Sequence, residues 1–195
     1  MQAISIAEGC TRCPALVANR HRIVHGYGSQ EAGVVFIGEA PGYKGSDLTG
    51  VPFTRDRSGV RLQQLLIDLG LSAETNPRVE QPQLRCFVTN VVRCNPPANR
   101  TPTRAEIANC QPYLWQELAL LQSRIVVPMG NVAMQVLFLR LKSQPAPSIS
   151  LAHAQIFAEN GVWIVPMRHP ARISNAGIQR FVAALRPLLQ TMACP

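Results

Sequence analysis

The sequence lacks the features that would place it in several common protein classes. No apolar run reaches the ~18 residues that a membrane-spanning helix requires. The first residues, MQAISIAEGC, show neither the basic segment nor the cleavage pattern of a secretory signal, so we expect a cytoplasmic protein without a membrane segment. The G-x-G-x-x-G, Walker A, H-E-x-x-H and G-x-S-x-G patterns are also missing. Nucleotide-cofactor, P-loop, zinc-protease and serine-hydrolase functions therefore have no support.

Acidic residues are scarce relative to basic ones. The chain has 11 Asp and Glu against 19 Lys and Arg, which gives a net charge of +8. This balance favours a polyanionic partner, nucleic acid first, because phosphate contacts release counterions. With 195 residues, of which 47% are hydrophobic, the chain suits one α/β domain with a full core and is rather short for two. Since it shows no repeat or linker, we expect one domain over residues 1–195.

Short apolar runs alternate with helical patterns along the chain. The runs predict four main strands, at residues 34–37, 87–92, 124–128 and 162–165. Helical spacing predicts four main helices, at residues 58–71, 103–121, 130–141 and from 174 onward. Asn160-Gly161 predicts a hairpin that leads into the last strand. The alternation indicates an open, mostly parallel four-stranded sheet with helices on both faces, which is a three-layer αβα fold.

Three of the predicted strands end in unusual polar residues, namely Glu39, Asn90 and His169. In open α/β sheets the ligand binds in the crevice beyond the carboxyl ends of the strands. We therefore expect these three side chains to converge on one cleft.

Six cysteines in a protein expected to be cytoplasmic argue against a disulfide framework and for metal or redox use. Cys10, Cys13, Cys94 and Cys110 form a pattern of soft metal ligands that suits either zinc or a [4Fe–4S] cluster, and the spacing alone favours zinc. Cys86 and Cys194 lie outside this pattern. They are interpreted as a buried small residue and a terminal residue without a role.

Several separated motifs occur in a characteristic order: CTRC, RIVHGYG, GEAPG with a downstream TGVPF, TNVVRCNPPANRTPT with EIANC after it, and HPA. Together they resemble the iron–sulfur (family four) uracil-DNA glycosylases over roughly the whole chain. The segment PFTRDRSG departs from that family and resembles the family-five enzymes instead. Lys44-Gly45-Ser46 replaces the acidic loop common in family four. These departures lie near the expected base pocket, so the range of damaged bases stays open.

The resemblance implies a role for each motif. The cysteine set Cys10, Cys13, Cys94 and Cys110 would hold a [4Fe–4S] cluster with a structural role. Asn90 would read uracil, since its amide can donate to O4 and accept from N3–H, whereas cytosine presents the reversed pattern. Phe53 would stack on the extruded base, and His169 would bind uracil O2 as negative charge develops there. The remaining pocket residues would be Gly38, Ala40, Pro41 and Gly42. Arg172 and Ile173 would contact DNA, with Ile173 as the wedge and Arg172 on a phosphate.

Glu39 is the one carboxylate that the motifs place in the cleft, where it would orient the attacking water and oppose the sugar cation. The alternative is that Glu39 only caps the GEAPG turn, with Asp47 and Asp56 as the next candidates. The predicted function is excision of uracil from single- or double-stranded DNA by a monomer, leaving an abasic site. A non-catalytic iron–sulfur DNA-binding protein with the same fold is the main alternative, and a small redox protein is the third.

Overall fold

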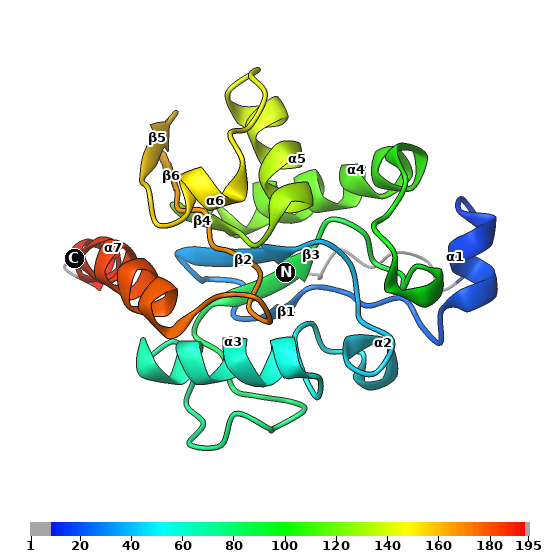
Figure 1. The fold of residues 1–195 in the computed structure, drawn as a ribbon, viewed down its shortest axis with the longest axis horizontal. Helices are drawn as coiled ribbons and strands as arrows, with labels where there is room; N and C mark the ends of the chain where they lie inside the picture. The colour runs from blue at the N-terminus through cyan, green and yellow to red at the C-terminus, as the bar shows by residue number, and fades with distance from the viewer. Residues whose placement is uncertain (1–8, 194–195) are drawn as a thin grey trace.

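The computed structural model describes residues 9–193, and its centre is a six-stranded sheet in the order β1-β3-β2-β4-β6-β5 (Figure 1). The strands are β1 (Tyr27–Gly28), β2 (Val34–Gly38), β3 (Phe87–Asn90), β4 (Ile125–Pro128), β5 (Phe157–Glu159) and β6 (Val162–Ile164). The four inner strands run parallel, whereas β1 and β5 pair antiparallel at the two edges. The predicted four-stranded parallel core is confirmed, but the strand number is six. The two-residue strand β1 is too short to produce a periodic signal.

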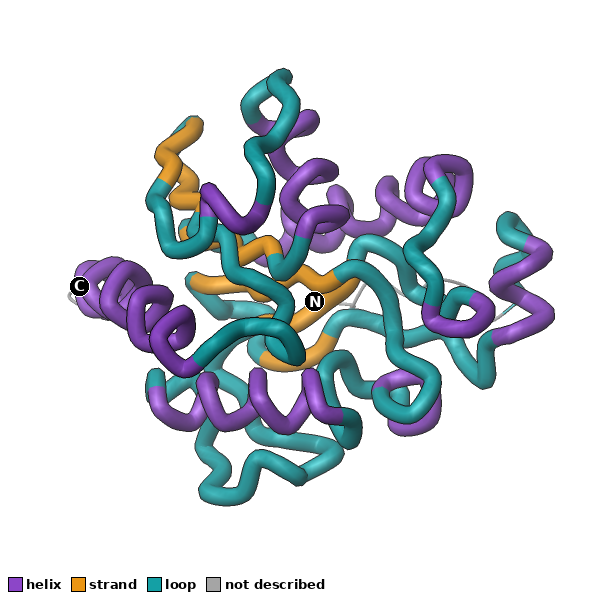
Figure 2. The backbone as a smooth tube through the Cα atoms, in the orientation of Figure 1, coloured by secondary structure: helices purple, strands orange, loops and turns teal. Residues whose placement is uncertain are grey.

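Helices cover both faces of this sheet (Figure 2). They are α1 (Pro14–Asn19), α2 (Ser46–Thr49), α3 (Arg57–Asp68), the 3₁₀ turn η1 (Pro97–Asn99), α4 (Arg104–Leu121), α5 (Asn131–Leu141), α6 (Ile149–Ala152) and α7 (Asn175–Ala193). The four longer helices and the hairpin between β5 and β6 agree with the sequence patterns, while the short helices α2 and α6 lie outside the predicted helices. No helix in the described part of the chain is both long and apolar enough to cross a bilayer.

The alternation of side chains along β2 divides the core into two layers. Val34 and Phe36 pack with residues of α3 and α7, whereas Val35 and Ile37 pack with residues of α4 and α5. Every residue of β2 is buried. A strand buried on both faces reads as a continuous apolar run, as a central parallel strand should. The three-layer αβα prediction is therefore confirmed.

Helix α4 begins with a capping box. Glu106 N–H donates to Thr103 Oγ1 at 3.2 Å, and the Glu106 carboxylate accepts from Thr103 N–H at 2.7 Å. Arg100 adds a bidentate ion pair to this carboxylate, with distances of 2.7 and 2.8 Å. These donors lower the pKa of Glu106 to about 2, the Arg100 hydrogen bond being the largest cause. The start of α4, and with it the position of Cys110, is thereby fixed.

Candidate active site

Parallel pairing of β2 and β3 brings two of the predicted site residues to one edge of the sheet. Gly38 lies opposite Asn90 in the register. The pairing continues past the strand ends, because Val91 N–H donates to Gly38 O at 2.9 Å and Val92 N–H donates to Glu39 O at 3.0 Å. Glu39 and Asn90 are thus held beside each other by backbone hydrogen bonds rather than by their side chains.

Asn90, Gly38 and Phe53 meet in a tight contact. A Cβ atom built on Gly38 would overlap Asn90 Oδ1 and would lie 2.6 Å from Phe53 Cε2, so only glycine fits there. Asn90 is 1% exposed, and its Oδ1 accepts no hydrogen bond from any residue in the described range 9–193. A buried acceptor without a donor costs about 1–3 kcal/mol. A ligand that donates a hydrogen bond to this atom, next to the aromatic ring, would remove that cost.

The backbone presents the Phe53 ring in an unusual conformation. Phe53 has φ of 54°, in the left-handed region, and Arg55 shares it with φ of 69°. The Phe53 carbonyl accepts from Gln63 Nε2 of α3 at 3.2 Å. Gly59 of α3 packs so closely that a Cβ there would lie 2.7 Å from the Phe53 carbonyl carbon. The start of α3 therefore holds the ring against the strand ends.

His169 lies across from this ring, in the loop between β6 and α7. The two ring centroids are 6.5 Å apart and the planes are tilted by 45°. Ala171 N–H donates to His169 Nδ1 at 3.3 Å, so in the neutral imidazole the proton resides on Nε2, which is then a donor. Burial lowers the pKa of His169, and the charge of Arg172 lowers it further, with Asp56 opposing. The neutral form is favoured, so His169 can donate without carrying a positive charge.

The Glu39 side chain interacts with residues from two other loops. Burial raises the pKa of Glu39, while a hydrogen bond to the Thr101 side chain and the charge of Arg172 oppose the rise. A half-buried carboxylate with a raised pKa is a better proton acceptor than an ordinary glutamate. The structure thus places a carboxylate, a neutral imidazole, an unpaired amide oxygen and an aromatic ring at one end of the sheet.

The other two candidate carboxylates are occupied elsewhere. Asp47 is fully buried and binds His21, whose backbone N–H lies 3.2 Å from each carboxylate oxygen and whose Nδ1 lies 2.6 Å from Oδ2. Asp56 caps α3 and accepts from Gly59 N–H at 2.8 Å. Both groups hold local structure, so neither is a better candidate for the water than Glu39.

The GEAPG turn is anchored by two asparagines that sequence reasoning missed. Asn95 Nδ2 donates to Pro41 O at 2.7 Å and to Asn99 Oδ1 at 2.8 Å. Asn99 Oδ1 also accepts from Tyr43 N–H at 2.9 Å. Next to them, Gly42 has room only for hydrogen, because a Cβ there would lie 2.7 Å from Asp56 Oδ2. No local sequence pattern signals these contacts, because the Asn95 side chain reaches Pro41, 54 residues away in the chain.

Comparison with known proteins agrees with this geometry. The chain matches the family model described as "Uracil DNA glycosylase superfamily" over residues 25–191. It belongs to this superfamily. The type-5 uracil-DNA glycosylase of Pyrobaculum aerophilum is 32% identical over 187 residues, which covers 86% of this chain and 81% of that protein. The type-4 uracil-DNA glycosylase of Archaeoglobus fulgidus is 31% identical over 168 residues, covering 84% and 77%. The type-5 enzyme of Thermus thermophilus is 37% identical over 153 residues, covering 69% of each chain.

Relatives of both types confirm the mixed resemblance. The two residues predicted to contact DNA, Arg172 and Ile173, differ in their exposure. Ile173 is 3% exposed and packs in the same core cluster as Phe181 of α7. Its carbonyl accepts from Arg61 Nη2 at 2.7 Å. A wedge residue must reach the DNA base stack from the protein surface, whereas the Ile173 side chain is packed in the core in this DNA-free structure. Arg172, its exposed neighbour, remains available to the substrate.

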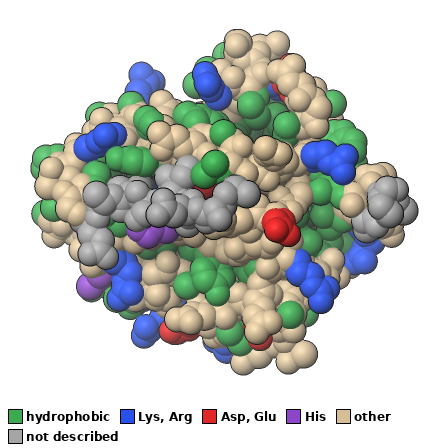
Figure 3. Space-filling model, turned by 180° about the vertical axis from the view of Figure 1, so that it is seen from behind, with side chains coloured by type: hydrophobic (Ala, Val, Ile, Leu, Met, Phe, Trp, Pro, Cys, Tyr) green, Lys and Arg blue, Asp and Glu red, His purple; other side chains and the backbone are tan. Residues whose placement is uncertain are grey.

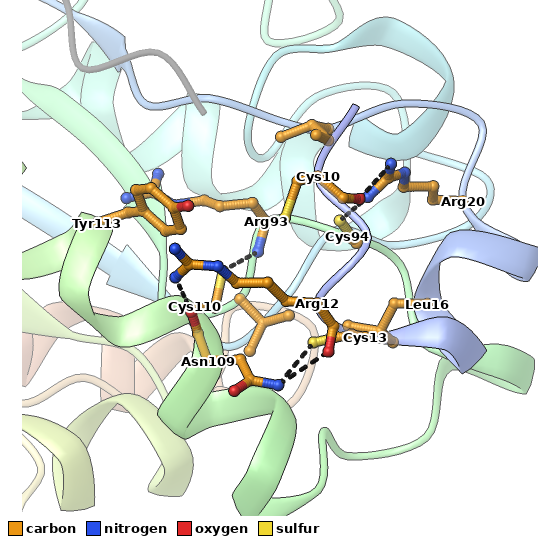
Figure 4. A pocket seen from close by; sticks show the side chains of 12 residues that line it. Cys10, Arg12, Cys13, Leu16, Arg20, Arg93, Cys94, Asn109, Cys110 and Tyr113 are labelled. Carbon is orange, nitrogen blue, oxygen red and sulfur yellow. Dashed lines mark hydrogen bonds between the residues drawn. The ribbon is translucent and has the colours of Figure 1, made fainter. Parts of the chain in front are cut away.

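The four patterned cysteines of this glycosylase-family chain line one pocket (Figure 4). Cys10 and Cys13 come from the segment before α1, Cys94 from the loop after β3, and Cys110 from α4. The pocket has about 350 Å³ of free space, open solvent included, and no Asp or Glu among residues 9–193 lines it. Cys86 is fully buried elsewhere, in agreement with its interpretation. Cys194 lies outside the described residues.

Three of these sulfurs accept hydrogen bonds. Arg20 Nη1 donates to Cys94 at 3.2 Å, Arg93 N–H to Cys110 at 3.4 Å, and Asn109 Nδ2 to Cys13 at 3.5 Å. Burial raises the pKa of the Cys110 thiol to about 11 and also raises that of Cys94. A cation that displaces the thiol protons would reverse this effect. Within residues 9–193, no three His, Cys, Asp or Glu side chains lie close enough together to hold a single metal ion.

Proposed function

We propose that this chain removes uracil from DNA by hydrolysing the N-glycosidic bond and leaves an abasic site. The observation that carries this proposal is the buried, unpaired Oδ1 of Asn90 beside the Phe53 ring. The relatives named above support it, because each is a uracil-DNA glycosylase by name. A chain that had kept only the fold would have no reason to leave this acceptor unsatisfied.

Recognition of the base follows from the chemistry of these two side chains. Asn90 Oδ1 accepts from uracil N3–H, and its amide nitrogen donates to O4. Cytosine has an acceptor at N3 and an amino group at C4, so it would leave the Asn90 amide unpaired on both sides. Sites that rely on a buried hydrogen-bonding group can reject the mismatched analogue by about 10⁴–10⁵-fold. The ring of Phe53 stacks on the base, a contact worth about 1–3 kcal/mol.

Cleavage of the N-glycosidic bond places negative charge on uracil and positive charge on the sugar. The protein has one polar group to face each charge. As the bond between C1′ and N1 breaks, its electron pair passes to the uracil ring, and negative charge develops on O2. The Nε2–H of His169 donates to this oxygen. Water adds its oxygen to C1′, and its proton passes to the Glu39 carboxylate. Solvent then protonates the uracil anion, so the products are free uracil and an abasic deoxyribose.

DNA contact is proposed at the end of the sheet that carries the site. Arg172 is exposed beside Glu39 and His169, where it can meet a phosphate. On the face turned away from the view of Figure 1, basic side chains are dispersed around the margin rather than gathered into a patch (Figure 3). The groups that we assign to binding and catalysis all lie on one chain, so we propose a monomer.

We also propose that Cys10, Cys13, Cys94 and Cys110 hold a [4Fe–4S] cluster. Zinc is the alternative, and it would require the sulfurs to move closer together than they lie here. The residues fit such a group, because the donor set is all sulfur and neighbouring N–H groups point at three of the sulfurs, as is common around thiolate-ligated clusters. When bound, the group would cross-link three chain segments. Metal analysis and visible absorption of the purified protein decide between iron–sulfur and zinc.

The deciding experiment is excision from synthetic DNA that contains one deoxyuridine. We expect abasic sites in single strands and in U·G pairs faster than in U·A pairs, because extrusion costs least where the base is unpaired. The matched control strands carry thymine or cytosine at the same position. Salt-dependent binding without excision would instead establish the non-catalytic DNA-binding alternative. Strands with hypoxanthine or xanthine test whether the PFTRDRSG segment accepts other deaminated bases.

A further inference from the structure

The buried side chain of His153 contacts the loop that carries His169. His153 directly follows α6 and is not part of that loop. His153 Nδ1 accepts from Arg168 N–H at 3.3 Å, and His153 Nε2 donates to Gly177 O at 3.0 Å. The next residue, Ala154, donates from its N–H to Pro166 O at 2.9 Å. These contacts bracket residues 168–177, the segment that presents His169 and Arg172.

The surroundings of His153 leave it little freedom. The side chain is buried, with 9% of the residue exposed, and its ring stacks on Phe181 of α7 with centroids 6.3 Å apart and planes 12° apart. Gly177 permits this approach, since a Cβ there would lie 2.8 Å from Ile173 Cγ1 and 3.4 Å from His153 Nε2. The imidazole is therefore packed between α6 and α7 with both nitrogens engaged.

The two hydrogen bonds require the neutral ring. One nitrogen must accept while the other donates, and protonation would turn the acceptor into a second donor facing Arg168 N–H. Burial lowers the pKa of His153, and the charges of Arg180 and Arg168 lower it further, while the hydrogen bond to Gly177 O opposes them. His169 has the same arrangement, with Nδ1 accepting from a backbone N–H.

We infer that His153 is a positioning residue for His169, because it binds the backbone immediately before the catalytic imidazole and the first turn of α7, where the same loop ends. The inference rests on the proposed function, in which His169 Nε2 must point at uracil O2. A displacement of roughly 1 Å at a reacting group can cost about 10²-fold in rate. His153 itself touches neither the base nor the water.

The first test is His153→Phe, which keeps an aromatic ring against Phe181 but removes both hydrogen bonds. We expect single-turnover excision to fall by about 10- to 100-fold while affinity for uracil-containing DNA changes by less than about threefold. His153→Asn retains an acceptor for Arg168 N–H and should recover part of the loss. The matched control is Ser123→Ala, which is also 9% exposed and loses one buried hydrogen bond, at 2.8 Å to Ala32 O. That variant should lose stability without losing rate.

The second test does not depend on activity. Amide hydrogen exchange is measured for residues 168–173 without DNA, in the parent and in both His153 variants. Exchange faster by about tenfold or more in this segment, with α3 unchanged, supports the inference. Unchanged exchange would overturn it, as would faster exchange with a parental excision rate. If the parent does not excise uracil, the proposed function fails, and the exchange data still decide whether His153 holds the loop. If His153→Phe does not fold, the same two outcomes are decided with His153→Asn.

Discussion

The proposed base pocket around Asn90 and Phe53 and the cysteine pocket around Cys94 share one stretch of chain. They differ in whether the protein satisfies their polar atoms with hydrogen bonds. Asn90 and Cys94 are four residues apart, at the end of β3 and in the loop that follows. In the base pocket the buried Asn90 oxygen has no donor among the described residues. In the cysteine pocket, protein N–H groups donate to three of the four sulfurs.

Under the proposed function, this difference separates a site for a transient ligand, the base, from a site for a permanently bound group. An unpaired buried acceptor raises the free energy of the unliganded protein by about 1–3 kcal/mol. A ligand that donates a hydrogen bond to this acceptor removes the cost while it is bound. Donors to sulfur instead stabilise thiolate charge, which is useful only if a cation stays bound. In this proposal, Asn90 at the start of the segment recognises the base, and Cys94 four residues later anchors the metal group.

The largest expected effect falls on the reacting side of the base pocket. Glu39→Gln should reduce single-turnover excision by about 10- to 1000-fold and leave binding of uracil-containing DNA nearly unchanged, because the neutral amide accepts no proton from water. The matched control is Glu31→Gln, an exposed glutamate that precedes β2 at the opposite edge of the sheet. A parental rate in Glu39→Gln would show that this carboxylate only caps its turn.

The pH dependence of excision by the parent and by Glu39→Gln tests the same role of Glu39. Excision requires ionised Glu39, so the parental rate should fall as pH drops through the pKa of this group, which burial raises above its ordinary 4.5. Because the pKa of His169 is lowered, its neutral form persists further into acid than that of an ordinary histidine. The acid limb assigned to Glu39 should be missing in Glu39→Gln, and single-turnover rates between pH 4 and 8 would reveal it. An identical limb in both proteins would assign the titration elsewhere.

A second, intermediate effect is expected on the reading side. Asn90→Ala should slow uracil excision and reduce the preference for uracil over cytosine by about 10- to 100-fold, since discrimination depends on the lost amide. Asn76→Ala, at an exposed turn where the side chain accepts from Arg78 N–H, is the control. Competition between U- and C-containing strands measures the preference directly. An equal loss on both bases would mean that Asn90 supports the pocket without reading the base.

The smallest effect on excision is expected from the cysteine pocket, where stability should change instead. Cys94→Ser should abolish the broad visible absorption and lower Tm by about 10 °C, from a loss of about 3–4 kcal/mol. Cys86→Ser, equally a buried cysteine but outside the pocket, should keep the absorption. A colourless parent that contains zinc would replace the cluster assignment. Uracil preference should be parental in Cys94→Ser, which would separate the two pockets.

The sequence was enough to predict which residues meet at the strand ends. Strand polarity puts the ends of β2 and β3 at one edge, so Glu39 and Asn90 had to be neighbours once the strands were identified. The sequence could not predict whether the Ile173 side chain points to the surface or into the core, because a change in the backbone angles of one loop residue reverses that direction. His153 and Asn95 were missed for a related reason: each bonds to backbone far away in sequence, and no local pattern records such a contact.

The left-handed backbone at Phe53 has a consequence for how this pocket can change. A non-glycine residue in that conformation is disfavoured by about 1–2 kcal/mol, and a β-branched one by more. Glycine at position 53 would relieve this strain, yet it would also remove the ring that we propose stacks on the base. Selection for a more stable protein and selection for uracil excision therefore pull in opposite directions at this position. The residues tolerated there are limited to those that accept the backbone angle and still provide a flat face.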